Sequence, residues 1–260
     1  MSKIWSFAKR AFMTGWYPYV GLLNKTWPSI TIAGKKLIVS PDVYKPLENE
    51  HACADYCNTG DRVLDLGCGS GVCAIFAADK AREVLAVDIS PSAVQNTKDN
   101  CARLGLGNVT VRQSDMFSNV DGKFDLILAN PPYIAVEFEK EEEQFATSVR
   151  FLPTLFGQVS EYLTPEGRLL VQFPIWFRHK IEKLGADHGL ELLQVKRTPN
   201  KSIGLFLLSL AYTQVGFRSA FYLFRVKQGV DAGSSGRPAA GGGVRATAQD
   251  PSRHLKQSAI

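Results

Sequence analysis

The chain has 260 residues, of which 45% are hydrophobic and 21% are charged, as is usual for a globular protein with a packed core. No apolar run reaches the roughly 18–20 residues that a membrane-spanning helix needs, and the first residues lack the apolar core of a secretory signal. The five cysteines (Cys53, Cys57, Cys68, Cys73, Cys101) lack metal-ligand spacing and are expected to be reduced thiols. We therefore expect a cytoplasmic protein that binds no metal.

The net charge of +5 is unevenly distributed along the chain. Residues 1–40 and 192–230 each contain six Lys and Arg residues and no acid, whereas residues 41–191 contain 14 basic and 23 acidic residues. Basic, aromatic-rich ends of this kind are typical of segments that contact a nucleic acid or a membrane surface. The alternative is an uneven distribution of surface charge without such a contact, which explains the pattern equally well. Residues 229–260 are rich in Gly, Ala, Ser and Pro, and we expect a disordered tail there.

Short β-rich runs alternate with helical segments from about residue 50. We expect strands over residues 62–66, 84–89, 108–115, 124–130, 167–173, 191–197 and 221–227. A helix is predicted over 90–105 because Ser90 can cap it, Pro91 suits its first turn and Gly105 can end it. Repeated strand–helix units predict a parallel sheet with helices on both faces, and ligands then bind at the carboxyl ends of its strands.

Three glycines follow the first of these strands directly, in the sequence DLGCGSG (65–71). Glycines let the backbone turn tightly and pass close to a ligand. The spacing G-x-G-x-G differs from the G-x-G-x-x-G of dinucleotide sites, and the acid before it would repel a pyrophosphate but attract an ammonium group. A tight turn without a ligand is the alternative. The candidate binding residues here are Asp65, Gly67, Cys68, Gly69 and Gly71.

Two further acids stand at the ends of the next two strands. Asp88 is placed to accept hydrogen bonds from ribose hydroxyls, as acids do in several nucleotide sites. Asp115 can accept a hydrogen bond from the exocyclic amine of an adenine. Each acid taken singly is explained equally well as a helix cap, but acids at successive strand ends favour a nucleoside. We include the adjacent Ile89 and Met116 as candidate binding residues.

The sequence Asn130-Pro131-Pro132-Tyr133 follows the fourth strand. Two prolines stiffen the loop, so that its carbonyl groups have fixed positions. The Asn130 side-chain oxygen and the Pro131 carbonyl can both accept hydrogen bonds from an NH₂ group, which directs the nitrogen lone pair toward an incoming methyl group. Tyr133 can stack on a planar amide or base. We predict that Asn130, Pro131 and Tyr133 form the catalytic site, and we count Asn130 among the candidate binding residues as well.

These motifs together resemble the class I S-adenosylmethionine-dependent methyltransferases with an NPPY loop, above all the release-factor glutamine methyltransferase group. Upstream, residues 41–48 resemble the entry segment of the eukaryotic and archaeal branch of that group. The resemblance covers roughly residues 40–175 and implies an α/β, Rossmann-like fold with a seven-stranded, mostly parallel sheet. It also implies S-adenosyl-L-methionine as cofactor, held by Gly67, Gly69, Asp88 and Asp115, with Asn130 to Tyr133 holding the acceptor nitrogen.

The chain departs from that group at several places. Asn49-Glu50 replaces the usual Asp-Thr, and the segment after the NPPY loop differs, which puts a release-factor substrate in doubt. We expect a basic, aromatic extension or cap over residues 1–40 and a methyltransferase domain over 41–228. An apolar insertion at 199–218 is expected to form a lid, a partner surface, an anchor at a membrane interface or a buried edge helix.

The predicted activity is methyl transfer from S-adenosylmethionine to a nitrogen of a planar amide, amine or base. The methyl acceptor is left open among a protein glutamine, a nucleic-acid base and a small molecule. One alternative is a small-molecule N- or O-methyltransferase, in which the extension and the insertion are pocket walls. A second alternative is a non-catalytic module that docks on nucleic acid or a membrane through its basic ends.

Overall fold

The computed structural model describes residues 18–131, 148–198, 203–204, 206–207 and 219–227. The chain divides into a compact unit over Met1–Lys227 and a second unit over Gln228–Ile260, and the second lies outside the described residues, as does the tail predicted there. Among the described helices, none has the length and the apolar character needed to cross a membrane.

The first unit is built on a seven-stranded sheet with the strand order β5-β4-β3-β6-β7-β9-β8. The strands are β3 (Arg62–Leu66), β4 (Glu83–Asp88), β5 (Val109–Gln113), β6 (Phe124–Ala129), β7 (Leu163–Pro174), β8 (Leu190–Arg197) and β9 (Ser219–Val226). Within this sheet, β9 is antiparallel to both β7 and β8, and the other described pairings are parallel. The predicted fold class is therefore confirmed, and the predicted strands agree with the observed ones to within a few residues.

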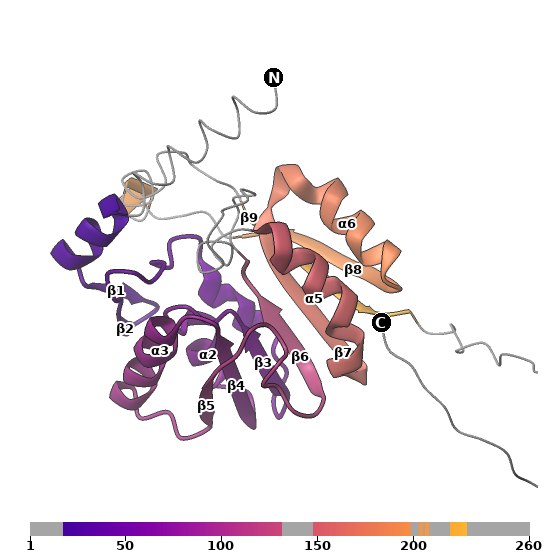
Figure 1. Ribbon diagram of the computed structural model, residues 1–260, viewed down its shortest axis with the longest axis horizontal. Coiled ribbons are helices and arrows are strands. Elements are labelled where there is room, and N and C mark those ends of the chain that lie inside the picture. Colours follow the sequence, from indigo (N-terminus) through magenta and orange to yellow (C-terminus); the bar gives the residue numbers. More distant parts are fainter. Residues whose placement is uncertain (1–17, 132–147, 199–202, 205, 208–218, 228–260) are drawn as a thin grey trace, which may run out of the picture. The chain divides into compact units, whose positions relative to one another are not determined.

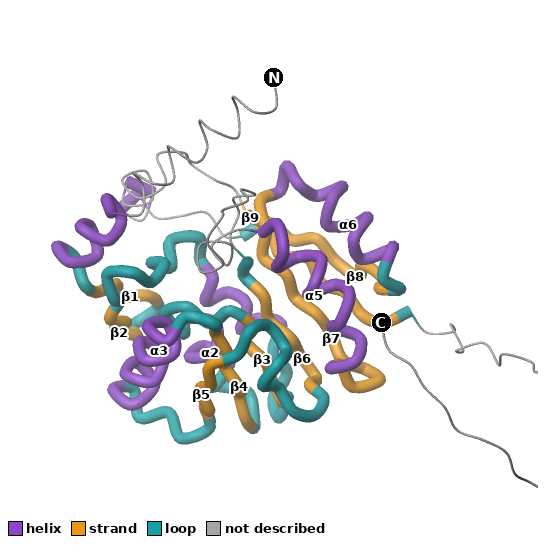
Figure 2. The backbone as a smooth tube through the Cα atoms, viewed as in Figure 1, coloured by secondary structure: helices purple, strands orange, loops and turns teal. Residues whose placement is uncertain are grey.

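Helices cover both faces of this sheet (Figures 1 and 2). They are α2 (Val72–Ala77), α3 (Pro91–Arg103), α5 (Ser148–Tyr162), α6 (Arg178–Asp187) and the short 3₁₀ helices η1 (Glu50–Tyr56) and η2 (Ile175–Phe177). Helices α5 and α6 pack with Leu64 and Leu66 of β3 in one apolar core, whereas η1 and α2 pack with Val63 in the other. This alternation follows from the period-2 geometry of a strand that is buried on both faces.

Helix α3 begins and ends where the sequence predicts. The Ser90 hydroxyl accepts a hydrogen bond from Ala93 N (3.3 Å), Pro91 is in the first turn, and Gly105 follows the helix with φ of 67°. A glycine tolerates this left-handed conformation without the steric penalty of a side chain.

A short hairpin precedes the sheet and packs against α3. Its strands β1 (Ser29–Ile32) and β2 (Lys35–Ile38) are antiparallel, and Leu37 is fully buried in the η1 and α2 core. The backbone of Ile38 exchanges hydrogen bonds with the Asn100 side chain of α3, both of 2.8 Å. Part of the predicted extension over residues 1–40 is therefore packed on the main sheet unit.

The chain order of the strands reverses between β3 and β6. The chain proceeds from β3 to β4 and β5 on one side, and then returns to β6 on the other side of β3. Open α/β sheets bind ligands at this switch point, outside the carboxyl ends of the strands. The glycine loop follows β3 and the Asn130 loop follows β6, so both predicted motifs lie at the switch point.

Candidate active site at the carboxyl ends of the strands

The glycine loop is held in place by backbone hydrogen bonds to the neighbouring strand. The N–H groups of Gly67 and Cys68 both donate to the carbonyl of Val87 in β4, at 2.8 and 2.9 Å. Gly67, Gly69 and Gly71 have φ values of 80°, 54° and 83°, which side chains disfavour. Among the residues that the structure describes, a Cβ atom at Gly69 would meet nothing within 4 Å. Gly67 and Gly71 face Phe151 and Thr97 instead, so Gly69 is the glycine of this loop whose backbone a ligand can approach most closely.

Asp65 is buried beneath this loop. Its Oδ2 accepts a hydrogen bond from Ala74 N of α2 at 2.9 Å. Burial raises the pKa of Asp65 to about 7, and the nearby Asp88 carboxylate raises it further, whereas the Ala74 N–H lowers it. A buried carboxyl of this kind gains from a nearby positive charge, which fits the ammonium group of a methionine moiety.

Asp88 joins the glycine loop to the start of α3. Its Oδ2 accepts from Gly69 N at 2.9 Å, and its Oδ1 accepts from Ser90 N at 3.0 Å. Burial also raises the pKa of this carboxyl. Each carboxylate oxygen has a second lone pair beyond these bonds, so Asp88 can hold the loop and still accept hydrogen bonds from ribose hydroxyls.

Asp115 and Met116 lie one strand further from the switch point. The Asp115 carboxylate is 3.7 Å from a guanidinium nitrogen of Arg150 in α5, and both side chains are about half exposed. Met116 has a positive φ of 50°, an uncommon conformation for a residue with a side chain. The carbonyl of Ile89 accepts a hydrogen bond from Gln113 Nε2 at 3.0 Å. The contact of Asp115 with an adenine amine stays a prediction, and the carboxylate is paired with Arg150 in this structure.

Asn130 and Pro131 come directly after β6. Leu66 pairs with Ala129, so Gly67 and Asn130 are the next residues on adjacent parallel strands. Asn130 is half-buried and Pro131 is buried. The structure therefore brings the start of the NPPY loop beside the glycine loop. Tyr133 lies outside the described residues, as does Pro132.

Helix α3 supports the glycine loop from below, which the sequence analysis did not anticipate. The Thr97 hydroxyl donates to the Gly69 carbonyl (3.0 Å), and Asn100 Nδ2 donates to the Ser70 carbonyl (3.0 Å). Cys68 is buried beside Thr97, and burial raises the pKa of its thiol well above the ordinary value. Polar residues on the inner face of an amphipathic helix are the signal that could have revealed these contacts.

The entry segment carries buried charged groups that fix it to the sheet. The Glu50 carboxylate is fully buried and accepts from Leu47 N (3.2 Å) and Glu48 N (2.9 Å). Burial raises the pKa of Glu50 to about 7. Glu48 is also buried, and its carboxylate accepts from the Ser219 hydroxyl of β9 at 3.1 Å. The Glu48 carbonyl accepts from Gln172 Nε2 of β7 at 3.0 Å.

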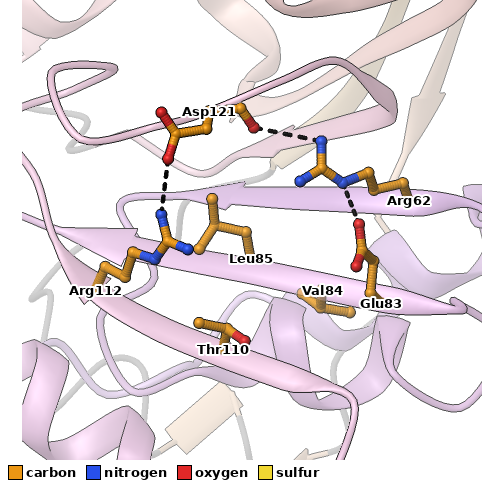
Figure 3. Close-up of a pocket in the computed structure, with 7 residues that line it drawn as sticks. All are labelled: Arg62, Glu83, Val84, Leu85, Thr110, Arg112 and Asp121. Atoms are coloured by element: carbon orange, nitrogen blue, oxygen red, sulfur yellow. Dashed lines mark hydrogen bonds and ion pairs between the residues drawn. The ribbon is translucent and has the colours of Figure 1, made fainter.

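A separate small hollow lies at the opposite ends of the strands (Figure 3). Arg62 and Glu83, at the starts of β3 and β4, form an ion pair there, and Arg112 pairs with Asp121 at 3.1 Å. The charged groups that line this hollow are thus already paired with one another. The motif residues lie at the carboxyl ends instead, and we place the candidate active site there.

The chain is similar to known methyltransferases. A methyltransferase domain family model matches residues 58–196. The chain is 35% identical to the release factor glutamine methyltransferase of Koribacter versatilis, over 54% of this chain and 58% of that protein. It is 53% identical to the ribosomal protein L11 methyltransferase of Thermosipho africanus, over 29% of each chain. The chain spans 60% or less of the length of the curated relatives that it matches.

Solved structures share the fold. A methyltransferase from Pyrococcus furiosus superimposes with a TM-score of 0.58 at 16% identity, covering 84% of this chain and 100% of that one. The ribosomal protein L11 methylase of Lactobacillus delbrueckii gives a TM-score of 0.53 at 22% identity, covering 73% of this chain and 84% of that one. The Rossmann-like architecture and the resemblance found in the sequence are both confirmed. The chain belongs to the methyltransferase domain family, whose cofactor is S-adenosylmethionine.

Proposed function

We propose that this protein transfers a methyl group from S-adenosylmethionine to the side-chain amide nitrogen of a glutamine in a protein. The observation that carries the proposal is the placement of Asn130 directly beside Gly67 at the switch point. A site for an NH₂ group thereby adjoins the loop that would hold the cofactor. The named activity of the relative from Koribacter versatilis favours glutamine among planar acceptors.

The residues of the site fit the cofactor. No described residue other than its chain neighbours lies within 4 Å of a Cβ atom built at Gly69, which would let a ligand approach the backbone there. Asp88 would hold the ribose, and the buried Asp65 would favour the ammonium group. The cofactor supplies an electrophilic methyl group on a sulfonium. Asn130 Oδ1 and the Pro131 carbonyl would accept the two N–H groups of the amide, hold its lone pair toward the methyl group, and stabilise the positive charge that develops on nitrogen.

The test uses the full-length protein with methyl-tritiated S-adenosylmethionine and three acceptor preparations. These are a peptide with a central glutamine, a matched peptide with glutamate in its place, and total RNA. We expect label on the glutamine peptide alone, released as methylamine on alkaline hydrolysis. Label on the RNA alone would refute the amide acceptor and favour a base nitrogen. No transfer to any acceptor, together with tight cofactor binding, would favour the small-molecule alternative.

The Asn130→Ala variant is the matched control in this assay. It should bind the cofactor with nearly the wild-type affinity, and yet transfer label far more slowly. Equal transfer by this variant and the wild type would show that the NPPY loop is not the acceptor site.

A further inference from the structure

Gln172 is a polar residue within an apolar strand. It lies in β7 among Leu169, Leu170, Val171 and Phe173, and it is only 2% exposed. Its Nε2 donates to the Glu48 carbonyl at 3.0 Å. Its Oε1 is buried and has no hydrogen-bond partner among the described residues. A buried amide oxygen without a donor loses its hydration and gains no hydrogen bond in return, so a further partner is expected for this atom.

The position of Gln172 in the sheet suggests its partner. Ala129 of β6 pairs with Val171 of β7, so Asn130 and Gln172 are the next residues on two adjacent parallel strands. The preceding pair, Leu128 and Leu170, packs in the core that η1 and α2 cover. Because side chains alternate along a strand, residues two positions further on face the same side. Adjacent strands are about 4.8 Å apart, which lets two amide side chains reach each other.

The hydrogen bond to the Glu48 carbonyl fixes the orientation of the Gln172 amide. The Glu48 carbonyl can only accept, so the NH₂ group of Gln172 must face Glu48 and Oε1 must face away. Glu48 in turn is held by Ser219 of β9 and by the Glu50 carboxylate. The acceptor atom of Gln172 is therefore presented from a rigid support.

We infer that Gln172 is a positioning residue whose Oε1 accepts a hydrogen bond from Asn130 Nδ2 once the cofactor is bound. If Gln172 holds the NH₂ group of Asn130, the Oδ1 of Asn130 must point away from Gln172. Oδ1 is the atom that would accept a hydrogen bond from the nitrogen to be methylated. The chain of bonds would run from the acceptor N–H to Asn130 Oδ1, from Asn130 Nδ2 to Gln172 Oε1, and from Gln172 Nε2 to the Glu48 carbonyl. Aligned amides polarise one another, which strengthens the terminal acceptor. The catalytic consequence rests on the proposed function, but the Asn130–Gln172 bond does not.

The bond is tested without any acceptor by NMR of the full chain, labelled with ¹⁵N in asparagine and titrated with S-adenosylhomocysteine. The Asn130 side-chain signal is identified by its loss in Asn130→Asp. We expect its NH₂ protons to move downfield on titration and to show a nuclear Overhauser contact with the Gln172 side chain. In Gln172→Met, which keeps the size but lacks the amide, the downfield shift should disappear. If the downfield shift is unchanged in Gln172→Met, or if the wild type shows no Overhauser contact between Asn130 and Gln172, the inference is overturned. The Overhauser measurement uses the wild type alone and does not depend on the folding of a variant.

Ser219→Ala is the matched control, because it loosens Glu48 and leaves the Gln172 amide intact. It should lower the urea midpoint of unfolding and retain the Asn130 shift. If Ser219→Ala abolishes the Asn130 shift as completely as Gln172→Met does, both variants merely loosen the segment. That result would contradict a specific bond between Asn130 and Gln172.

Turnover on the glutamine peptide gives the catalytic readout. Gln172→Met should lower kcat about ten- to hundredfold with an unchanged cofactor Kd, the scale of one oriented hydrogen bond. A fall in cofactor affinity equal to the fall in kcat would refute the positioning role. If the wild type does not methylate the peptide, the proposed acceptor fails, and the NMR result still decides on the bond.

Discussion

The conformation of Gly71 makes a quantitative prediction about the glycine loop. Gly71 has a φ of 83°, and a Cβ atom added there would lie 2.8 Å from Cγ2 of Thr97. Thr97 is fully buried and its hydroxyl donates to the Gly69 carbonyl, so it cannot turn away without losing that bond. Gly69 is the natural comparison, because its φ is also positive but its added Cβ would meet nothing within 4 Å in the described part of the chain.

The expected magnitudes follow from these two environments. A left-handed conformation costs a residue with a side chain about 1–2 kcal/mol, which both Gly69→Ala and Gly71→Ala should lose. The overlap with Thr97 adds about 1–3 kcal/mol in Gly71→Ala alone. Thr97→Ser removes the clashing methyl group and keeps the hydroxyl. In the Thr97→Ser background, Gly71→Ala should therefore cost about 1–2 kcal/mol less than in the wild type.

Urea unfolding followed by circular dichroism measures all four free energies of the cycle. Calorimetry with S-adenosylhomocysteine, run in parallel, reports whether the loop still binds a ligand. If Gly71→Ala costs no more than Gly69→Ala, or if Thr97→Ser leaves its cost unchanged, the contact with Thr97 does not determine the loop conformation.

Three further predictions concern the acids and the acceptor loop. Asp88→Ala should weaken the binding of S-adenosylmethionine about ten- to hundredfold, which is the scale of charge-assisted hydrogen bonds. If calorimetry shows unchanged affinity in the folded variant, Asp88 does not bind the ribose. Asn130→Ala should slow turnover about a hundredfold in the labelled-methyl assay, while the affinity for the cofactor stays nearly constant. If turnover and cofactor affinity fall by the same factor, Asn130 has a structural role instead. The pKa of Asp65 is raised from 3.8 to about 7 in the folded protein, so the folded state holds this proton up to a higher pH than the unfolded state does. The free energy of unfolding should therefore fall as the pH rises from about 4 to about 7, by up to roughly 4 kcal/mol from this group. Asp65→Asn should remove that part of the pH dependence in urea titrations, and an equally steep slope in the variant would contradict it.

Much of the fold could be predicted because the sheet is buried on both faces. Continuous apolar runs bounded by glycines or acids identify such strands, and β3 begins and ends at the predicted residues, Arg62 and Leu66. The candidate ligand-binding residues could be grouped from the sequence for a related reason. Parallel strands bring their carboxyl ends to one edge of the sheet, and the candidates stand at those ends. Asp65, Asp88 and Asn130 accordingly lie together at the switch point.

The residues that the sequence did not reveal are those whose role depends on partners far away in the chain. Acidic side chains are usually exposed, so Glu48 and Glu50 gave no sign that they are buried against the sheet. The hairpin over 29–38 was also missed, because two four-residue strands are too short to show a period. The single glutamine in β7 was visible in the sequence, but its contact with Glu48 spans 124 residues and no local pattern predicts it.

The hairpin of β8 and β9 opens at the same edge as the candidate active site. β8 is antiparallel to β9, which is antiparallel to β7, so β8 ends at the carboxyl edge of the sheet. Thr198 N donates to the Ser219 carbonyl at 3.0 Å and closes the stem. The intervening chain thus leaves and returns at one closed point, and doubling the length of such a connection costs only about 0.6 kcal/mol. The length and sequence of residues 199–218 can therefore change with little effect on the pairing of β8 with β9.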